Sequence, residues 1–239
     1  MEDQVHRLVD KAWAKYQSTP PNQRLLIGIA GIPGSGKTTL SQMVSRELNN
    51  RAVQASHASS DPPPATFLPM DGFHLTRAAL DAMPDPANAH ARRGAAFTFD
   101  APKFLRLVQA LRAASPPGSA PILAPSFDHA IKDPKEEDVA VLPTHRIVVL
   151  EGNYLALDED VWRDAAALLD ELWFVEVDFD VARRRLRERH VRAGIAKNIE
   201  EGDRRAREND LVNGGEIVSR RLKVHEVIQS REDGSWVHE

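Results

Sequence analysis

The sequence predicts a three-layer α/β fold, with a mostly parallel central sheet and helices on both of its faces. Two observations carry this prediction. Short apolar runs, typical of strands that are buried on both faces, alternate along the chain with segments of helical periodicity. The first of these runs leads directly into a glycine-rich loop and a helix. An alternating strand–helix order favours parallel pairing with right-handed crossovers.

The first predicted element is an amphipathic helix over residues 2–17, in which Val5, Leu8, Val9 and Ala12 recur at helical spacing. Such a helix would pack on the sheet or on another subunit. The sequence therefore leaves a monomer and a homodimer both open.

A buried strand is predicted over residues 25–30 and a helix over 37–48, with a glycine-rich loop between them. Ser and Pro dominate residues 55–65, which predicts an exposed connection before a short strand over 66–70. Residues 72–98 show little apolar periodicity, so we expect a mobile or loop-rich insertion there.

Helices and buried strands are also predicted to alternate in the second half of the chain. A helix is predicted over residues 99–114, with Asp100 as its N-cap and Pro102 in its first turn. Two further apolar runs predict buried strands over 146–150 and 172–177.

Bulk composition restricts the function classes. The 239 residues suit one domain, 1–239, and the net charge of −4 gives no general argument for binding nucleic acid or an acidic membrane surface. The absence of cysteine excludes disulfides, cysteine-ligated metals and thiol catalysis. No apolar run approaches the roughly 20 residues that span a bilayer. We therefore expect a cytoplasmic protein with no nucleic-acid and no membrane partner.

The glycine-rich loop carries the most specific motif. Residues 31–38 read GIPGSGKT and match G-x-x-x-x-G-K-[ST] at every position, between a predicted strand and a predicted helix. Glycines let the backbone wrap around a phosphate with its N–H groups pointing inward, and the helix N-terminus adds partial positive charge. Lys37 would bridge the β- and γ-phosphates, and the Thr38 hydroxyl would bind Mg²⁺. The predicted nucleotide-binding residues are Gly31, Gly34, Ser35, Gly36, Lys37, Thr38 and Thr39.

Three carboxylates follow predicted strands, at the edge of a parallel sheet where ligands bind. Asp71 would accept a proton from an attacking hydroxyl or orient it, and a turn-forming Asp before Gly is the plain alternative. Glu151 would hold Mg²⁺ directly or through water. Asp178 precedes a helix and is interpreted as its N-cap.

Arginines are concentrated in a predicted helix over residues 181–191, which a second helical segment over 199–211 follows. Arg185, Arg189 and Arg192 share one face by the i, i+4, i+7 rule. A solvated helix face is the plain alternative for most of these side chains.

We interpret this arginine-rich segment as a lid over about residues 181–198. Such a lid would close on the triphosphate and bring positive charge to the transferring phosphoryl group. Arg187 is the candidate for the catalytic arginine, with Lys37 and Asp71 as the other catalytic residues. Arg192 is a candidate for binding the substrate.

Taken together, GIPGSGKTT, MDGFH, RRGAAFTFD, PSFDHAIKD, VVLEGNYL and ENDLVN resemble the phosphoribulokinase/uridine kinase family of P-loop kinases. The chain is most similar to the nucleoside/nucleotide kinase-like branch that is related to pantothenate kinase, over about residues 25–220. This resemblance implies a P-loop NTPase fold, ATP with Mg²⁺, Asp71 as the base, Glu151 near the metal and an arginine-bearing lid. It also implies acceptor binding by the insertion 72–98 and by the strip that begins at Pro125. The implied substrate-binding residues are Asp71, His74, Arg93, Phe127, His129 and Arg192.

The resemblance leaves the phosphate acceptor open, because Phe127 stands where uridine kinases tend to have Tyr and Asn153 departs from their EGI sequence. A small-molecule acceptor with a hydroxyl group is expected, with a nucleoside first and a sugar, a polyol or a pantothenate-like alcohol next. The alternatives from other classes are a regulatory NTPase switch and a degenerate kinase that serves as a scaffold. No N-K-x-D element for reading guanine occurs, which speaks against a GTPase.

Overall fold

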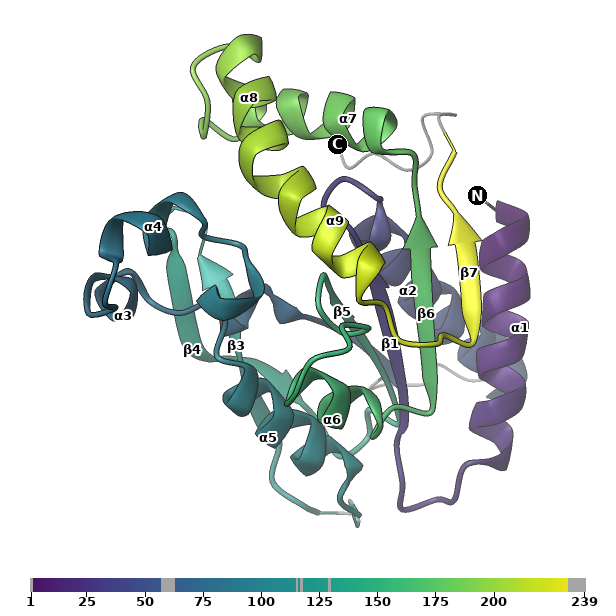
Figure 1. Ribbon diagram of the computed structural model, residues 1–239. Helices are drawn as coiled ribbons and strands as arrows, with labels where there is room; N and C mark the ends of the chain where they lie inside the picture. The colour runs from purple at the N-terminus through teal and green to yellow at the C-terminus, as the bar shows by residue number, and fades with distance from the viewer. Residues whose placement is uncertain (1, 57–62, 115, 117, 129, 232–239) are drawn as a thin grey trace.

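The computed structural model describes residues 2–56, 63–114, 116, 118–128 and 130–231. Its centre is a five-stranded sheet in the order β2-β5-β1-β6-β7, in which every pair is parallel. Figure 1 shows helices on both sides of this sheet. The predicted three-layer α/β fold is confirmed. The strands are β1 (Leu25–Gly31), β2 (Ala65–Pro69), β5 (Ile147–Gly152), β6 (Glu171–Glu176) and β7 (Glu226–Gln229).

Strand β1 explains why the apolar runs do not alternate with polar residues. Leu25, Ile27 and Ile29 pack into one buried cluster, and Leu26 and Ala30 pack into a second one. Successive side chains of a strand point to opposite faces, so each face of the sheet has its own core. Both faces are covered, and every residue of β1 and β5 is buried.

Two layers of helices supply the cover. Helices α1 (Glu2–Ser18) and α2 (Lys37–Ser56) contribute to the first cluster. Helices α5 (Ala101–Arg112), α6 (Trp162–Ala166) and α9 (Leu211–Ser219) contribute to the second. The predicted helix over 37–48 is correct in its start and too short, since α2 continues to Ser56. Asp100 caps α5 as predicted, by accepting a hydrogen bond from the Lys103 backbone N–H.

Helix α1 packs on the sheet of its own chain. Lys11 and Lys15 reach the Glu171 carboxylate of β6, with Nζ–Oε distances of 3.0 and 2.9 Å. Lys11 and Arg7 also pair with Glu226 of β7. The sequence left open whether this helix packs on the sheet or on another subunit, and in the structure it packs on the sheet.

The segment 72–98 contains short helices and turns, where the sequence predicted a loop-rich insertion. It holds the end of the 3-10 turn η1 (Met70–Phe73) and the helices α3 (Arg77–Asp81) and α4 (Pro86–Ala91), followed by the turn η2 (Ala96–Thr98). Side chains cap both helices, since Thr76 and Asp85 accept backbone N–H bonds at their starts. Helices of this length are too short to show a periodicity in the sequence.

A two-stranded antiparallel sheet stands beside this insertion, formed by β3 (Ile122–Asp128) and β4 (Asp133–Val141). Sequence reasoning missed this hairpin and strand β7. Polar residues occupy most of β4, and β7 has only four residues, so neither shows the apolar run of a buried strand.

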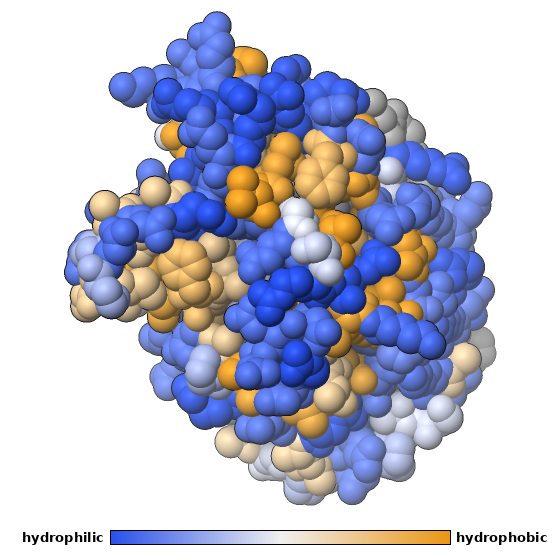
Figure 2. Space-filling model, in the orientation of Figure 1, coloured by the Kyte–Doolittle hydropathy of each residue, from blue (hydrophilic) through white to orange (hydrophobic). Residues whose placement is uncertain are grey.

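The predicted lid, about residues 181–198, covers most of α7 (Phe179–Arg192) and the loop after it, and it ends just before α8 (Ile199–Arg205). We call α7, this loop and α8 the lid; the π-helix η3 (Ala206–Asp210) then leads into α9. Asp178 is the N-cap of α7 as predicted, accepting from the Asp180 and Val181 backbone N–H groups. Figures 1 and 2 show the lid above the carboxyl ends of the strands, with a mostly hydrophilic surface. Within the described residues, no helix is both long enough and apolar enough to cross a membrane.

Candidate active site at the phosphate loop

The phosphate loop lies between the end of β1 and the start of α2, as its motif predicts. Gly34 and Gly36 have φ angles of +79° and +85°, a region that favours glycine. A Cβ at Gly31 would lie 2.6 Å from the Ser35 Oγ and 2.9 Å from the Val175 carbonyl oxygen. The loop conformation therefore depends on these glycines for both backbone geometry and space.

Two hydroxyl groups, one in this loop and one in the first turn of α2, are buried without a hydrogen-bond partner among the described residues: the Ser35 Oγ and the Thr39 Oγ1. Buried polar groups are nearly always hydrogen-bonded, so such exceptions need an explanation. Phosphate oxygens would act as acceptors for both hydroxyls. The loop residues thus fit the phosphates of a nucleoside triphosphate.

Lys37 and Glu151 form the centre of the site. The Lys37 Nζ lies 3.7 Å from the Glu151 Oε1, and the two side chains are 11% and 7% exposed. The Thr38 side chain also acts on the Glu151 carboxyl, where it opposes the rise that burial causes in its pKa. It lies within β5 rather than after it, in register with Ile29 of β1. The structure thus brings the predicted phosphate lysine and both predicted metal ligands together.

Burial dominates the electrostatics of this pair. It raises the pKa of Glu151 to about 7, against the opposing effect of the Lys37 charge, and the Asp71 charge adds to the rise. Burial also lowers the pKa of Lys37, while Glu151 and Asp71 oppose that shift. Asp71 acts on both partners, so its carboxylate faces the same site.

Asp71 lies in η1, directly after β2, and its side chain is exposed to the solvent. The neighbouring Gly72 packs against the hairpin so closely that a Cβ there would lie 2.1 Å from the Pro125 carbonyl oxygen. Asp71 therefore lies where the phosphate loop meets the acceptor strip. An exposed carboxylate at this position is accessible to the hydroxyl group of a substrate.

Aromatic rings lie beside Asp71, on the side of the predicted acceptor strip. The His74 ring lies 4.0 Å from the Phe99 ring and 4.9 Å from the Phe127 ring, measured between centroids. Its Nδ1 is 2.8 Å from the Asp71 carbonyl oxygen, which fixes the ring relative to the carboxylate. The predicted residues His74 and Phe127 thus lie together beside Asp71. Their binding of a substrate stays a prediction.

Arg93 lies in the same region, but its guanidinium group is engaged by the protein. It donates to the carbonyl oxygens of Leu75 and Lys132, pairs with Asp133 at 2.9 Å, and lies over the Phe127 ring. The geometry makes Arg93 a residue that positions Phe127, and binding of the acceptor by Arg93 stays a prediction. His129 lies outside the described residues.

The lid packs directly on the phosphate loop. A Cβ at Gly34 would lie 2.9 Å from the Ala182 carbonyl oxygen. The Arg185 Nη1 donates to the Gly34 carbonyl oxygen at 3.2 Å. The charge of Arg189 lowers the pKa of Lys37, which means that Arg189 lies close enough to act on the phosphate site.

The arginines of the lid therefore divide into different roles. Arg185 and Arg189 approach the loop, and they share the helix face on which the sequence placed Arg192. Arg187 has its Nε buried with no hydrogen-bond partner among the described residues, and its backbone carbonyl packs on Gly202. The catalytic role of Arg187 and the substrate role of Arg192 stay predictions. The sequence placed Arg189 on one helix face with Arg185 and Arg192, but Arg189 was not among the predicted site residues.

Comparison with known proteins gives a consistent result. A family model described as "AAA domain" matches residues 27–206. The chain is 51% identical over 167 residues to "ATP-dependent kinase-like protein notR'" of Aspergillus versicolor, covering 70% of this chain and 95% of that relative. It is 40% identical over 191 residues to a Schizosaccharomyces pombe protein named "Putative uridine kinase C227.14", covering 80% of this chain and 77% of that relative.

Solved structures show the same fold. A "putative fructose transport system kinase" from Silicibacter sp. TM1040 is 32% identical and gives a TM-score of 0.76, covering 92% of this chain and 98% of that one. YFH7 from Saccharomyces cerevisiae gives a TM-score of 0.80 at 24% identity, covering 96% of this chain and 99% of that one. The likeness to YFH7 is one of fold.

Proposed function

This chain belongs to the AAA domain family, among relatives that are ATP-dependent kinase-like P-loop proteins, and we propose that it moves the γ-phosphate of ATP to a hydroxyl group of a small molecule. One observation carries the proposal: Lys37 and Glu151 form a buried pair, 3.7 Å apart, at the edge of a complete phosphate loop, and the Asp71 charge acts on both of them. A phosphate-binding cation, a buried metal-side carboxylate and an exposed carboxylate are the groups that phosphoryl transfer requires.

We assign the nucleotide side of the site to the loop residues. Lys37 would contact the β- and γ-phosphates, and Thr38 and Glu151 would hold Mg²⁺ directly or through water. When bound, Mg²⁺ would neutralise charge on the phosphate oxygens. Mg²⁺ is commonly held by one or two carboxylates together with substrate phosphates, which matches a site with a single buried glutamate.

The chemical step uses Asp71. The acceptor oxygen forms a new bond to the γ-phosphorus, while the bond from that phosphorus to the bridging oxygen breaks and ADP leaves. The hydroxyl proton passes to the Asp71 carboxylate. Arg189, with Arg187 as the second candidate, would stabilise the charge on the transferring group, and lid closure would exclude water as a competing acceptor.

For the acceptor we propose a nucleoside first, in line with the resemblance to the phosphoribulokinase/uridine kinase family. The His74 and Phe127 rings beside Asp71 supply aromatic surface against which a base would pack. The relative named as a uridine kinase supports the same choice. A sugar or polyol is the second class, and the relative described as a fructose transport system kinase supports it. A pantothenate-like alcohol is the third.

The test is ADP release with Mg-ATP across a panel of nucleosides, sugars, polyols and pantothenate, with the mass of each product measured. We expect release that depends on one acceptor class, and a product heavier by one phosphoryl group. ATP hydrolysis that no acceptor accelerates, or nucleotide binding without turnover on any panel member, would contradict the proposal and favour a switch or a scaffold.

A further inference from the structure

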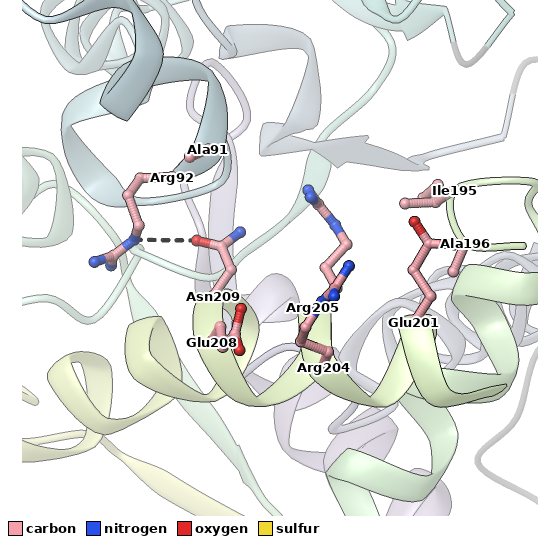
Figure 3. Close-up of a pocket in the computed structure, with 9 residues that line it drawn as sticks. All are labelled: Ala91, Arg92, Ile195, Ala196, Glu201, Arg204, Arg205, Glu208 and Asn209. Carbon is pink, nitrogen blue, oxygen red and sulfur yellow. Dashed lines mark hydrogen bonds between the residues drawn. The ribbon is translucent and has the colours of Figure 1, made fainter. Parts of the chain in front are cut away.

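A pocket whose lining includes no phosphate-loop residue lies between the end of the insertion and the lid. Its volume is about 370 Å³, within the range of small-molecule sites. Figure 3 shows that Ala91 and Arg92 form one wall, while residues of α8, η3 and the loop before α8 form the other. Ile195 and Ala196 make part of the lining apolar. The pocket can therefore enclose more than a single ion.

Arginines give this pocket its chemistry. Arg92, Arg204 and Arg205 line it, together with two carboxylates, Glu201 and Glu208. Arg92 donates to the side-chain oxygens of Asn209 and Asn213, which are neutral partners and leave its charge uncompensated. Glu201 accepts a hydrogen bond from the Lys197 backbone N–H. Cationic groups thus outnumber the carboxylates of the lining.

Arg205 is the decisive residue. Its Nε is buried and has no hydrogen-bond partner among the residues that the structure describes. Neither Arg204 nor Arg205 forms an ion pair with a described residue. A buried guanidinium donor without an acceptor is unfavourable, because it has lost its hydrogen bonds to water and forms none with the protein. An acceptor from outside the chain would remove this cost.

Contacts connect the pocket to the proposed acceptor side. Asn209 donates from its side chain to the Arg93 carbonyl oxygen, directly beside the pocket wall at Arg92. The Arg93 guanidinium lies over the Phe127 ring, which in turn lies 4.9 Å from the His74 ring next to Asp71. The motifs RRG and ENDLVN, at 92–94 and 208–213, therefore hold the pocket at the edge of the acceptor region.

We propose that this pocket binds an anionic group, a phosphate or a carboxylate, on the molecule that accepts the γ-phosphate. Arg205 and Arg204 bind the anion through charge-assisted N–H···O bonds, and the apolar wall at Ile195 contacts the neighbouring part of the acceptor. The inference rests on the proposed phosphotransfer and narrows its substrate class. For a nucleoside acceptor, it predicts one that carries a phosphate away from the hydroxyl that reacts.

The first arm of the test is independent of turnover. Inorganic phosphate is titrated into the protein with Mg-ADP at saturation, so that the nucleotide site is filled, and binding is followed by calorimetry. We expect Arg205→Gln to weaken phosphate binding about tenfold or more, because a charge-assisted hydrogen bond to an anion is lost. Arg205→Lys should retain part of the affinity. Arg46→Gln removes the same charge from an exposed position of α2 and should change the affinity less than about twofold.

Folding of each variant is checked by thermal unfolding. The exposed side chain of Arg204 gives a second variant, Arg204→Gln, with the same expected loss if Arg205→Gln fails to fold. Equal phosphate affinity in the unaltered protein, Arg204→Gln and Arg205→Gln would overturn the proposal. A complete absence of phosphate binding to the unaltered protein would overturn it as well.

The second arm uses acceptors that differ only in the anion. Uridine is paired with uridine 3′-monophosphate, and glycerol with glycerol 3-phosphate and with glycerate, which separates phosphate from carboxylate recognition. We expect kcat/KM to favour an anionic member, and Arg205→Gln to lower this preference about tenfold while leaving the neutral member unchanged. An unchanged preference would overturn the anion site but leave phosphotransfer standing. If no acceptor is phosphorylated, the proposed function fails, and the phosphate titration still shows whether the pocket binds an anion.

Discussion

At the scale of single residues, the contact between Lys37 and Glu151 decides what the site can do. Two opposite charges lie 3.7 Å apart in a nearly dry environment. Removing one partner of such a pair leaves the other charge uncompensated, which is strongly unfavourable. The negative phosphates of ATP would give Lys37 a second partner, so this arrangement suits a site that is completed by its substrate.

We expect Lys37→Ala to lower kcat/KM for ATP by about 10²–10³, because a cation that stabilises the transferring phosphoryl group is lost. Steady-state kinetics with varied ATP would measure this. Lys135→Ala is the matched control, since Lys135 is exposed on β4 and pairs with Asp138. Turnover that survives in Lys37→Ala at the level of Lys135→Ala would refute the assignment of the phosphate loop.

Asp71→Asn tests the acceptor side separately. The carboxylate is exposed and next to the aromatic pair, so we expect kcat to fall by about 10²–10⁴ through loss of the base. The affinity for ATP should change little, because Asp71 acts on the hydroxyl. Asp160→Asn, at a 95% exposed side chain, serves as the control. A collapse of ATP affinity with unchanged kcat would instead make Asp71 a ligand of the nucleotide.

The positions of site residues could be predicted where a local motif fixes the geometry, while their roles stay predictions. Lys37 and Thr38 follow from the loop itself, and Asp71 and Glu151 follow from the rule that parallel strands end at one edge of the sheet. Arg93 shows the limit of such rules. Its guanidinium pairs with Asp133 of β4, a partner 40 positions away in a hairpin that the sequence did not reveal. No local pattern records that contact.

At the scale of elements, the close contact of η1 with β3 holds the predicted acceptor strip against Asp71, the proposed base. We expect Gly72→Ala to destabilise the protein by about 1–3 kcal/mol, because its Cβ would meet the Pro125 carbonyl at 2.1 Å and a backbone group cannot rotate away. The KM for the acceptor should rise as the hairpin shifts. Denaturant unfolding and acceptor kinetics would measure the two effects.

Gly215→Ala supplies the matched control for that experiment. Gly215 lies in α9 with no atom within 4 Å of a Cβ built on it, so alanine is accommodated. Alanine in a helix interior is favoured over glycine by roughly 0.5–1 kcal/mol, and we expect a gain of this order. If both variants lost equal stability, the argument from space at Gly72 would fail.

The stability of the lid should depend on pH through Asp203 of α8, which pairs with Arg183 of α7. Hydrogen bonds from Arg183, aided by Arg207, hold the pKa of Asp203 at about 2, below its ordinary value of 3.8. A carboxyl with a lowered pKa contributes stability above the unfolded-state pKa, and that contribution is lost as the pH falls through the folded-state pKa. We therefore expect Asp203→Asn to lower the Tm by a constant amount above about pH 4. The difference should shrink towards zero near pH 2.

Thermal unfolding of both proteins across this range would measure the effect. Asp164→Asn, on α6, is a control outside the lid. A Tm difference that does not change between pH 4 and pH 2 would show that Asp203 acts through something other than its charge.

The same scale shows why some elements could be predicted and others could not. Strands β1, β5 and β6 are buried apolar runs, so their composition alone predicts that they are buried. In the hairpin β3–β4, strand β4 is mostly polar and exposed, so the hairpin depends on the pairing of its two strands rather than on a continuous apolar pattern. Helices of five or six residues, such as α3 and α4, depend on side-chain caps.

At the scale of the whole molecule, contacts between distant parts of the chain surround the phosphate loop. Helix α1 is joined to β7 by two hydrogen bonds between the Gln4 side chain and the Gln229 backbone, residues that are 225 positions apart. Helix α7 rests on Gly34, and Arg185 connects the loop to Ser230 beyond β7. A ligand that orders the loop therefore acts on segments from both ends of the described chain.

Nucleotide binding should thus appear as global stabilisation. A ligand at about 100 times its Kd stabilises the folded state by about 2.7 kcal/mol. For a chain of this size, each kcal/mol raises the Tm by roughly 2–4 °C, so a non-hydrolysable ATP analogue with Mg²⁺ should raise it by roughly 5–11 °C. Omitting Mg²⁺ should reduce the shift, since Thr38 and Glu151 then lose the ion between them and the phosphates. Differential scanning calorimetry would measure each condition. An equal shift with and without Mg²⁺ would remove Glu151 from the metal site while leaving the nucleotide in the loop.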